Sequence, residues 1–245
     1  MTPADPQATA IDLAAGVPMQ VARGSVQTDG DGSRQATLLF PQGTAATMKL
    51  PDGSIQSLAK LTVRATEYTV GANGPASMPA VMPPNIGYTY CVELTADEAV
   101  AANAIEVLFS RPLPFYVENF LRFPVGTTMP VCFYDRNAGI WVASDNGKAI
   151  KILSIMGGKA DLEADGDGMA DSSATLAALG VTDAERGQLA ALYGAGKTQW
   201  RFPVAHFSAW DANWGTRCKD NICDPPNQPM PEVEDGEDEP RCEEG

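Results

Sequence analysis

The stretch Trp200-Arg-Phe-Pro-Val-Ala-His-Phe-Ser-Ala-Trp-Asp-Ala-Asn-Trp214 holds three of the four tryptophans of this 245-residue chain and its only histidine. Trp200, Phe202 and Val204 alternate with other residues, a period of two that is typical of a half-buried strand. Polar residues then interrupt the alternation, while Trp210 and Trp214 remain as large apolar anchors. The segment predicts a closing strand followed by an aromatic latch that pins the end of a folded unit.

Upstream of this segment, from residue 25 to residue 156, short runs with strand periodicity follow one another between turn residues. The clearest run is 86–94, where every second residue is large and apolar. The sequence Asp145-Asn-Gly147 is typical of a β-hairpin turn and predicts one between strands at 140–142 and 150–155. Pro112 and Pro114 are expected to confine 113–117 to an edge strand or a bulge.

Many short strands without a βαβ rhythm predict a mainly β protein, an antiparallel β-sandwich of the fibronectin or immunoglobulin type. We expect a small insert with a calcium loop and helices, and a disordered acidic tail. The predicted organisation is a leader at 1–24 that packs loosely or adds an edge strand, a sandwich domain at 25–156, an Asp-rich loop with two short helices and a closing aromatic strand at 157–215, and an acidic, Pro-rich linker at 216–245.

Charge excludes some classes of partner. The formal net charge is −14, and residues 216–245 hold ten acidic and three basic residues, which is half of it. Nucleic-acid binding is not expected because it depends on neutralising phosphates with Lys and Arg. No apolar run approaches the ~18–20 residues that span a bilayer, so membrane insertion is not expected either. The N-terminal sequence does not resemble a secretion signal, so we expect that any such signal was removed or lies upstream.

The strongest chemical signal is the acidic stretch from 161 to 171. Carboxylates alternate there with small residues around Gly168, and hard oxygens spaced in this way converge on Ca²⁺ in calcium loops. Position twelve is Ala174 rather than the Glu of an EF-hand, so the stretch is closer to the loops of dockerin and thrombospondin repeats. An acidic surface loop without metal is the alternative. The predicted calcium ligands are Asp161, Glu163, Asp165, Asp167, Asp171 and the carbonyl of Met169.

Catalysis has few candidate residues. Any Ser–His or Cys–His mechanism would need His206, which shares the parity of Phe202 and Val204 and is therefore expected to be a packing residue. The carboxylates show no paired spacing that acid–base chemistry would use. The sequence thus predicts a protein that is not an enzyme.

The five cysteines are an odd number, so one of them has no partner within the chain. Cys218 and Cys223 are candidates for a small disulfide loop that fastens the latch. Cys91 and Cys132 lie opposite the apolar stripes of their strands, and they either pair across neighbouring strands or stay free. Cys242 is left over.

Three stretches carry a resemblance to a known family: Ala160-Asp-Leu-Glu-Ala-Asp-Gly-Asp-Gly-Met-Ala-Asp171, Ala177-Ala-Leu-Gly-Val-Thr-Asp-Ala-Glu-Arg186 and the segment 200–214. Together with 36–43, 63–70 and 117–126, they resemble the region ahead of the repeat barrel in RHS/YD-repeat proteins, the bacterial relatives of teneurins. The resemblance covers roughly residues 30 to 245, and its most specific part is 206–214.

The resemblance implies a non-catalytic structural module that plugs or caps the β-shell of a secreted or cell-surface, toxin-type bacterial protein. Its partner would be the downstream YD-repeat barrel of the same polypeptide, where Cys242 would also find its partner. No YD repeat is present in these residues. The alternative is a stand-alone extracellular adhesion or carbohydrate-binding module. Docking would use an exposed surface made by His206, Phe207, Trp210, Asp211 and Trp214.

Overall fold

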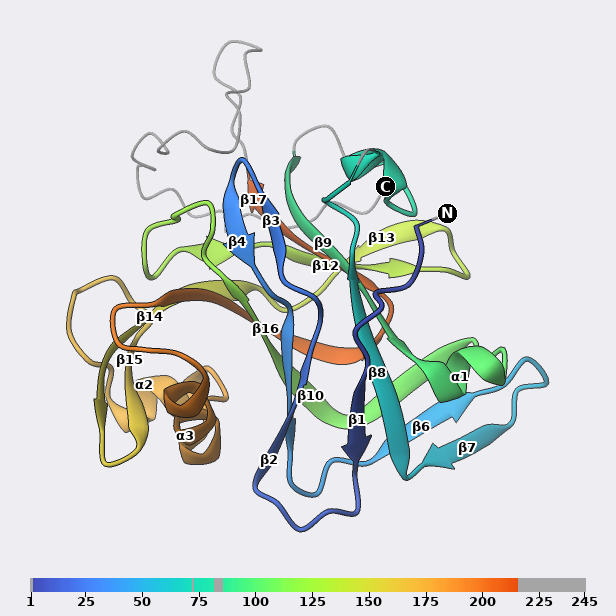
Figure 1. Ribbon diagram of the computed structural model, residues 1–245, viewed down its shortest axis with the longest axis horizontal. Helices are drawn as coiled ribbons and strands as arrows, with labels where there is room; N and C mark the ends of the chain where they lie inside the picture. The colour runs from blue at the N-terminus through green and yellow to red at the C-terminus, as the bar shows by residue number, and fades with distance from the viewer. Residues whose placement is uncertain (1, 72, 82–85, 216–245) are drawn as a thin grey trace.

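The computed structural model describes residues 2–71, 73–81 and 86–215, and for 86–89, 214 and 215 it describes the backbone alone. The chain folds into two antiparallel sheets packed against each other, with helices at the periphery (Figure 1). The predicted mainly β, antiparallel sandwich is therefore confirmed. It is larger than an immunoglobulin domain, whose two sheets hold about 7 to 9 strands in total.

The first sheet, sheet A, has six strands in the order β1-β8-β9-β17-β12-β13. In that order they are Thr9–Asp12, Lys60–Glu67, Ile86–Ala96, Ala209–Gly215, Val131–Asp135 and Ile140–Ala143.

The second sheet, sheet B, has nine strands, six of them in the order β11-β14-β16-β10-β5-β2. In that order they are Thr128–Met129, Gly147–Met156, Thr198–Phe207, Glu106–Glu118, Thr37–Pro41 and Met19–Arg23. β15 (Lys159–Glu163) pairs with β14, while β6 (Ala46–Lys49) pairs with β10 and with β7 (Ile55–Leu58). A separate hairpin, β3 (Gln27–Asp29) and β4 (Gly32–Arg34), forms at the predicted Asp-Gly-Asp-Gly turn.

The main core lies between the two sheets and is rich in aromatic side chains. Phe115 and Phe202 of sheet B stack with ring centroids 4.5 Å apart. Trp200 is fully buried, stacks on Phe123 at 4.8 Å and donates a hydrogen bond from its indole nitrogen to Asn119 Oδ1 at 2.8 Å. The alternating side chains that predicted strands in the sequence are the ones that fill this space.

The C-terminal segment joins the two sheets. β16 lies between β14 and β10 in sheet B, and β17 lies between β9 and β12 in sheet A. The corner between them is at Ser208, whose carbonyl accepts a hydrogen bond from Leu94 N at 3.0 Å. Residues 25–156 are thus not a complete sandwich. Gly157 and Gly158, read as a boundary in the sequence, form the turn of the β14–β15 hairpin with φ of +57° and +76°.

The leader packs firmly rather than loosely, because it adds an edge strand to each sheet: β1 pairs with β8, and β2 pairs with β5. Asp5 fixes its start. Its backbone N–H donates to Thr66 Oγ1 at 2.9 Å, and its carboxylate accepts from the N–H of Ser25 at 2.8 Å. A Cβ added at Gly24 would lie 2.8 Å from the carbonyl oxygen of Ala65, so this position admits no side chain without a shift.

Two local predictions need correction. Asp145-Asn-Gly147 does not form a hairpin, because β13 belongs to sheet A and β14 to sheet B. Gly147 instead permits close approach, since an added Cβ would lie 2.9 Å from the carbonyl oxygen of Arg201. The two prolines do not lie in an edge strand, because β10 is paired on both sides. A register shift between Leu108 and Leu113 contains Pro112, in agreement with the predicted bulge, whereas Pro114 lies in regular register opposite Pro203 of β16.

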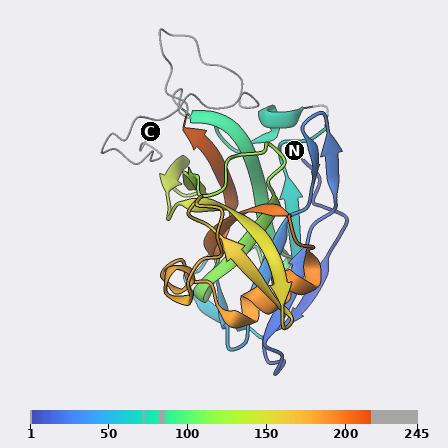
Figure 2. The same ribbon diagram turned by 90° about the vertical axis from the view of Figure 1, so that its left-hand side faces the viewer.

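The helices are short: α1 (Asp97–Ala101), α2 (Ser173–Ala178), α3 (Asp183–Leu192) and the 3₁₀ turn η1 (Gly74–Ser77). α2 and α3 pack beside the β14–β15 hairpin (Figure 2). The spacing of Thr182 and Glu185 in the sequence predicts a capping box, and the structure confirms it: the two residues satisfy each other's backbone N–H groups at the start of α3. Within the described residues, no helix is long and apolar enough to cross a membrane.

Candidate functional site

The segment expected to form an exposed docking surface is mostly buried. Phe207 is 7% exposed, Trp210 is 1% exposed and Asp211 is fully buried. Phe202 stacks on Trp210, and Phe133 lies against it at 5.6 Å. The docking prediction is therefore wrong for these three residues, because Phe207 ends β16, an interior strand of sheet B, and Trp210 and Asp211 belong to β17, an interior strand of sheet A. The side chain of Trp214 lies outside the described residues.

His206 lies at the edge of this aromatic cluster and is half-buried. Its ring meets Phe133 edge-on at 4.5 Å and lies 5.1 Å from the ring of Trp210. Burial lowers the pKa of His206, so the ring is neutral near pH 7. These contacts support the interpretation of His206 as a packing residue.

Asp211 lies on the opposite face of sheet A from Trp210. It is directly across from Cys91 on β9 and from Cys132 on β12. Neither oxygen of its carboxylate has a hydrogen-bond partner, and the same holds for the amide atoms of Asn213 nearby. The pKa of Asp211 rises to about 8, because burial penalises the charged form. The amide of Asn213 offsets part of this rise, although no hydrogen bond of ordinary geometry joins the two side chains.

Cys91 and Cys132 do not form a disulfide with each other. Cys91 is a free, buried thiol, and Cys132 is disulfide-bonded. The topology explains why they do not form a bond, because β17 separates their strands and two strand spacings of ~4.8 Å exceed the Cα separation of a disulfide. The predicted pair Cys218 and Cys223, and Cys242, lie outside the described residues.

The Asp-rich loop follows β15 and folds back on itself through its own carboxylates. Glu163 accepts a hydrogen bond from Gly168 N at 3.0 Å, and Asp167 accepts one from Met169 N at 2.7 Å. Asp171 accepts from Ala164 N at 2.6 Å, which closes the loop. Burial raises the pKa of the Asp171 carboxyl, and the nearby charges of other loop aspartates add to the rise.

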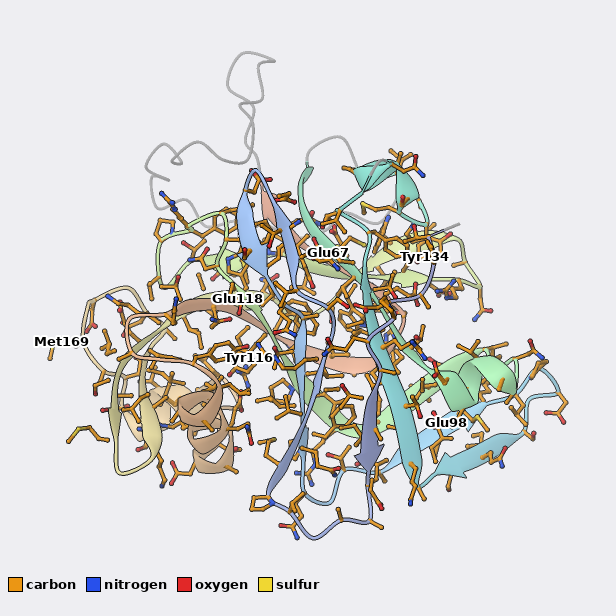
Figure 3. The ribbon with its side chains drawn as sticks, in the orientation of Figure 1. Glu67, Glu98, Tyr116, Glu118, Tyr134 and Met169 are labelled. Carbon is orange, nitrogen blue, oxygen red and sulfur yellow. The ribbon has the colours of Figure 1, made fainter. Side chains whose placement is uncertain are left out.

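Asp161 does not belong to this loop. It lies in β15, where its carboxylate accepts a hydrogen bond from Ser154 Oγ at 2.6 Å and pairs with Arg186 of α3 at 2.9 Å. The side chain of Met169 points outward at one end of the molecule (Figure 3). The predicted ligand set thus loses Asp161, because that carboxylate ties the hairpin to the helix.

No group of three or more metal-ligating side chains is arranged to hold a metal ion in the part of the chain that the structure describes. In the loop, all four carboxylates use an oxygen to accept a backbone N–H from the loop itself, Asp165 doing so from Asp167 N at 3.1 Å. Calcium binding by Glu163, Asp165, Asp167 and Asp171 stays a prediction.

The structure contains two buried ion clusters that the sequence did not predict. Arg201 of β16 binds Glu185 of α3 at 2.8 Å, and Tyr116 of β10 donates to the same carboxylate at 2.5 Å. In the other cluster, Arg34 is bound by Asp29 and by Glu67, each at 2.7 Å. Asp29 and Arg34 face each other across one hairpin, but no local spacing predicts the clusters as wholes, since Glu67, Glu185 and Tyr116 lie far from their arginines in the sequence. Each joins separate elements of the fold.

A hollow of about 220 Å³ lies beside Glu67, between the N-terminal segment 2–6 and β8. It is smaller than the ~300–1,000 Å³ of typical ligand pockets. The Glu67 carboxylate is held by Arg34 and Thr69, and burial raises its pKa. The Oε1 atom of Glu67 is therefore engaged in holding β4 against β8.

No protein-family model matches this chain, and comparisons with curated proteins and with solved structures gave no match.

Proposed function

We propose that this chain is a non-catalytic structural module that plugs or caps the β-shell of a secreted or cell-surface RHS/YD-repeat protein of bacteria. The observation that carries the proposal is the role of the segment 198–215. The stretch with the most specific resemblance to that family, 206–214, forms most of β17, an interior strand of sheet A, and β16 just before it is an interior strand of sheet B. A sequence signature that builds a fold, rather than a cleft, supports a structural role.

The use of the buried charges supports the same proposal. Arg201 and Glu185 hold α3 on sheet B, and Arg34 holds the β3–β4 hairpin against β8 through Glu67. Arg186 and Asp161 join α3 to β15. These ion pairs connect elements of secondary structure, which is the use expected in a rigid module.

Burial of the aromatic latch changes the docking hypothesis. Phe207 and Trp210 are occupied within the fold, so contact with a YD-repeat shell must use other surfaces of the module. The same burial removes Trp210 as the ligand-binding ring of an adhesion or carbohydrate-binding module. No observation in the described residues favours that alternative.

The test is cross-linking mass spectrometry on the native protein from its source organism, with the chain and the YD-repeat shell in one preparation. The proposal expects cross-links between lysines of this module, such as Lys60 and Lys151, and shell residues. A matched sample unfolded in urea should lose them. A native protein without YD repeats, or a module that forms no such links, would overturn the proposal. Binding to a glycan array would then put the adhesion module first.

A further inference from the structure

The outer face of sheet A contains a carboxylic acid, Asp211, that has no counter-ion among the described residues. Asp211 is fully buried, and neither of its oxygens has a partner; Asn213 is also fully buried with both amide atoms unpartnered. Buried polar groups in proteins are nearly always hydrogen-bonded, so a pair such as this one calls for an explanation. The explanation has to account for a group in the middle of a sheet, since β17 is paired with β9 and β12 on its two sides.

The neighbours of Asp211 are apolar, thiol-bearing or already paired. Cys91, Cys132, Trp141 and Ala209 form a buried cluster on this face, on which Met78 and Ala80 of the 73–81 segment pack. Trp141 donates a hydrogen bond from its indole nitrogen to the carbonyl of Ala80 at 3.3 Å, which fixes that cover. The titratable and charged groups on the packed elements are Glu67 at the end of β8, Tyr68 after it, Cys91 and Glu93 on β9, Tyr134 on β12, and Arg136 in the β12–β13 turn; Cys132 on β12 is disulfide-bonded and does not titrate.

The cation among these groups is used elsewhere. Arg136 binds Glu93 at 2.6 Å, and Tyr68 donates to the same carboxylate at 3.0 Å. On the neighbouring strand β9, Asp211 therefore faces the neutral thiol of Cys91. The charge of Glu93 on the same strand is already balanced by Arg136. Within the part of the chain that the structure describes, an ionised Asp211 would be a buried charge with no counter-ion.

We propose that the proton on Asp211 locks this part of sheet A closed over the thiol of Cys91. While the proton is bound, the neutral acid can stay among apolar neighbours. An ionised carboxylate instead favours conformations in which β17 and its neighbours separate far enough for water to reach it. The same opening gives reagents access to Cys91. Low pH therefore favours the closed sheet, and rising pH favours the open one.

The pKa values agree with this geometry. Burial raises the pKa of Asp211 to about 8 in the closed sheet, while an opened, hydrated Asp has a pKa near ~3.9. Opening therefore releases a proton, and the opening equilibrium rises between these two pKa values and levels off above the higher one. Burial, and then the charge of Asp211, also raises the pKa of the Cys91 thiol, so the thiol is unreactive while the sheet is closed.

The lock goes beyond the proposed structural role and does not depend on it. It can be tested on the intact chain with methyl methanethiosulfonate, a thiol reagent that works in acid. Modification of Cys91 would be followed by peptide mass spectrometry at pH 5 to 9. At each pH the rate would be divided by that of the urea-unfolded chain, which removes the ionisation of the thiol itself and leaves the opening constant.

In the wild-type chain we expect the opening constant to rise up to about tenfold per pH unit between pH 5 and pH 8 and to level off above pH 8. Asp211→Asn places a neutral, nearly isosteric side chain at the same position and should make the profile flat. Asp145→Asn removes an exposed carboxylate at the end of β13 and should keep the wild-type profile.

The same steep rise in Asp211→Asn, or a flat profile in the wild type, would overturn the proposal. If Asp211→Asn does not fold, two measurements on the wild-type chain decide the matter. Hydrogen exchange of the β17 amides should show the same pH-dependent opening. The ¹³Cγ resonance of Asp211 should titrate far above the ordinary range of aspartates, and a titration near pH 4 would overturn the lock.

Discussion

Two buried acids in this molecule are treated in opposite ways. Glu185 is 1% exposed and lies between an arginine and a tyrosine hydroxyl, with Arg201 Nε at 2.8 Å. Asp211 is 0% exposed and has neither kind of partner. The first acid is buried together with a cationic partner, whereas the second is buried by remaining neutral. The comparison shows that burial alone does not tell how a carboxyl group is accommodated in the interior.

The difference follows from where the two acids lie. Glu185 starts α3 and faces sheet B, where a long side chain from β16 can reach it. Asp211 is inside a sheet, where its nearest neighbours are the residues directly opposite on two strands, Cys91 and Cys132. Neither of those residues can supply a positive charge.

The largest change in the free energy of unfolding should come from removing Arg201, the counter-ion of Glu185. Arg201→Ala leaves Glu185 buried without its partner, and we expect the free energy of unfolding to fall by about 4 kcal/mol. Urea denaturation at pH 7 measures this. The double variant Arg201→Met/Glu185→Leu is the control, and it should recover most of the loss because no charge remains buried. Equal losses in both variants would assign the effect to packing instead.

Replacing Asp211, the acid without a counter-ion, should instead raise the free energy of unfolding. The raised pKa of Asp211, about 8, means that its stabilising, protonated form is complete below pH 4 and that stability is lost as pH rises toward 8. Asp211→Asn removes that loss, although its amide also lacks partners. We therefore expect a net gain of about 2 kcal/mol at pH 7, and little gain at pH 4. Urea denaturation at the two pH values would measure it, and a gain that does not depend on pH would contradict this account.

A third group of acids, in the Asp-rich loop, is neither paired with arginine nor fully buried. If Glu163, Asp165, Asp167 and Asp171 bind calcium as the sequence predicts, Ca²⁺ at ten times its Kd should stabilise the fold by about 1.4 kcal/mol. Thermal melting with Ca²⁺ and with chelator measures the shift. Asp167→Asn should reduce it, whereas Asp161→Asn should not, because Asp161 binds Arg186. Equal melting temperatures with Ca²⁺ and with chelator would contradict the prediction.

The smallest effect should come from a pair that is half in solvent. Arg136 is 54% exposed and binds Glu93, which keeps the hydroxyl of Tyr68 as a second partner. Arg136→Gln should cost about 0.5 kcal/mol in urea denaturation, and 1 M salt should weaken the wild-type pair by a similar amount. A loss as large as that of Arg201→Ala would mean that the distinction between buried and exposed partners does not hold in this protein.

The sequence predicted the sandwich because alternation reports which face of a strand is apolar. Alternation does not show what packs against the other face of a strand. For this reason the prediction of an exposed aromatic latch is wrong. Trp210 was taken for a surface anchor, although the interior position of β17 is set by pairing with β9 and β12, far away in the chain. The missed signal was the parity of Cys91 and Cys132. Two thiols opposite their apolar stripes indicated that the outer face is also covered.

Other local errors have the same origin. β15 was missed because its acidic residues resemble the calcium loop that follows, and Asp161 was assigned to the loop for that reason. The Asp-Asn-Gly147 turn resembles a hairpin turn, yet the glycine is needed for contact with β16. The capping box of α3 was predicted correctly, since all its atoms lie within four consecutive residues. A motif whose interacting residues are neighbours in the chain can be predicted from the sequence. A feature that depends on pairing with a distant strand cannot.

The crossing of 198–215 from one sheet to the other has a consequence for how the protein is made. Until β16 emerges from the ribosome, β14 has no strand to join it to β10, and until β17 follows, the β12–β13 hairpin has no attachment to β9. Until then the strands can pair only in separate groups, namely β1-β8-β9 and β12-β13 of sheet A, and β2-β5-β10-β6-β7 and β11-β14-β15 of sheet B. Such late, long-range closure is slow and leaves strand edges open to wrong partners. Chaperones that bind unpaired strands should have their longest opportunity on this chain just before the last tryptophans are added.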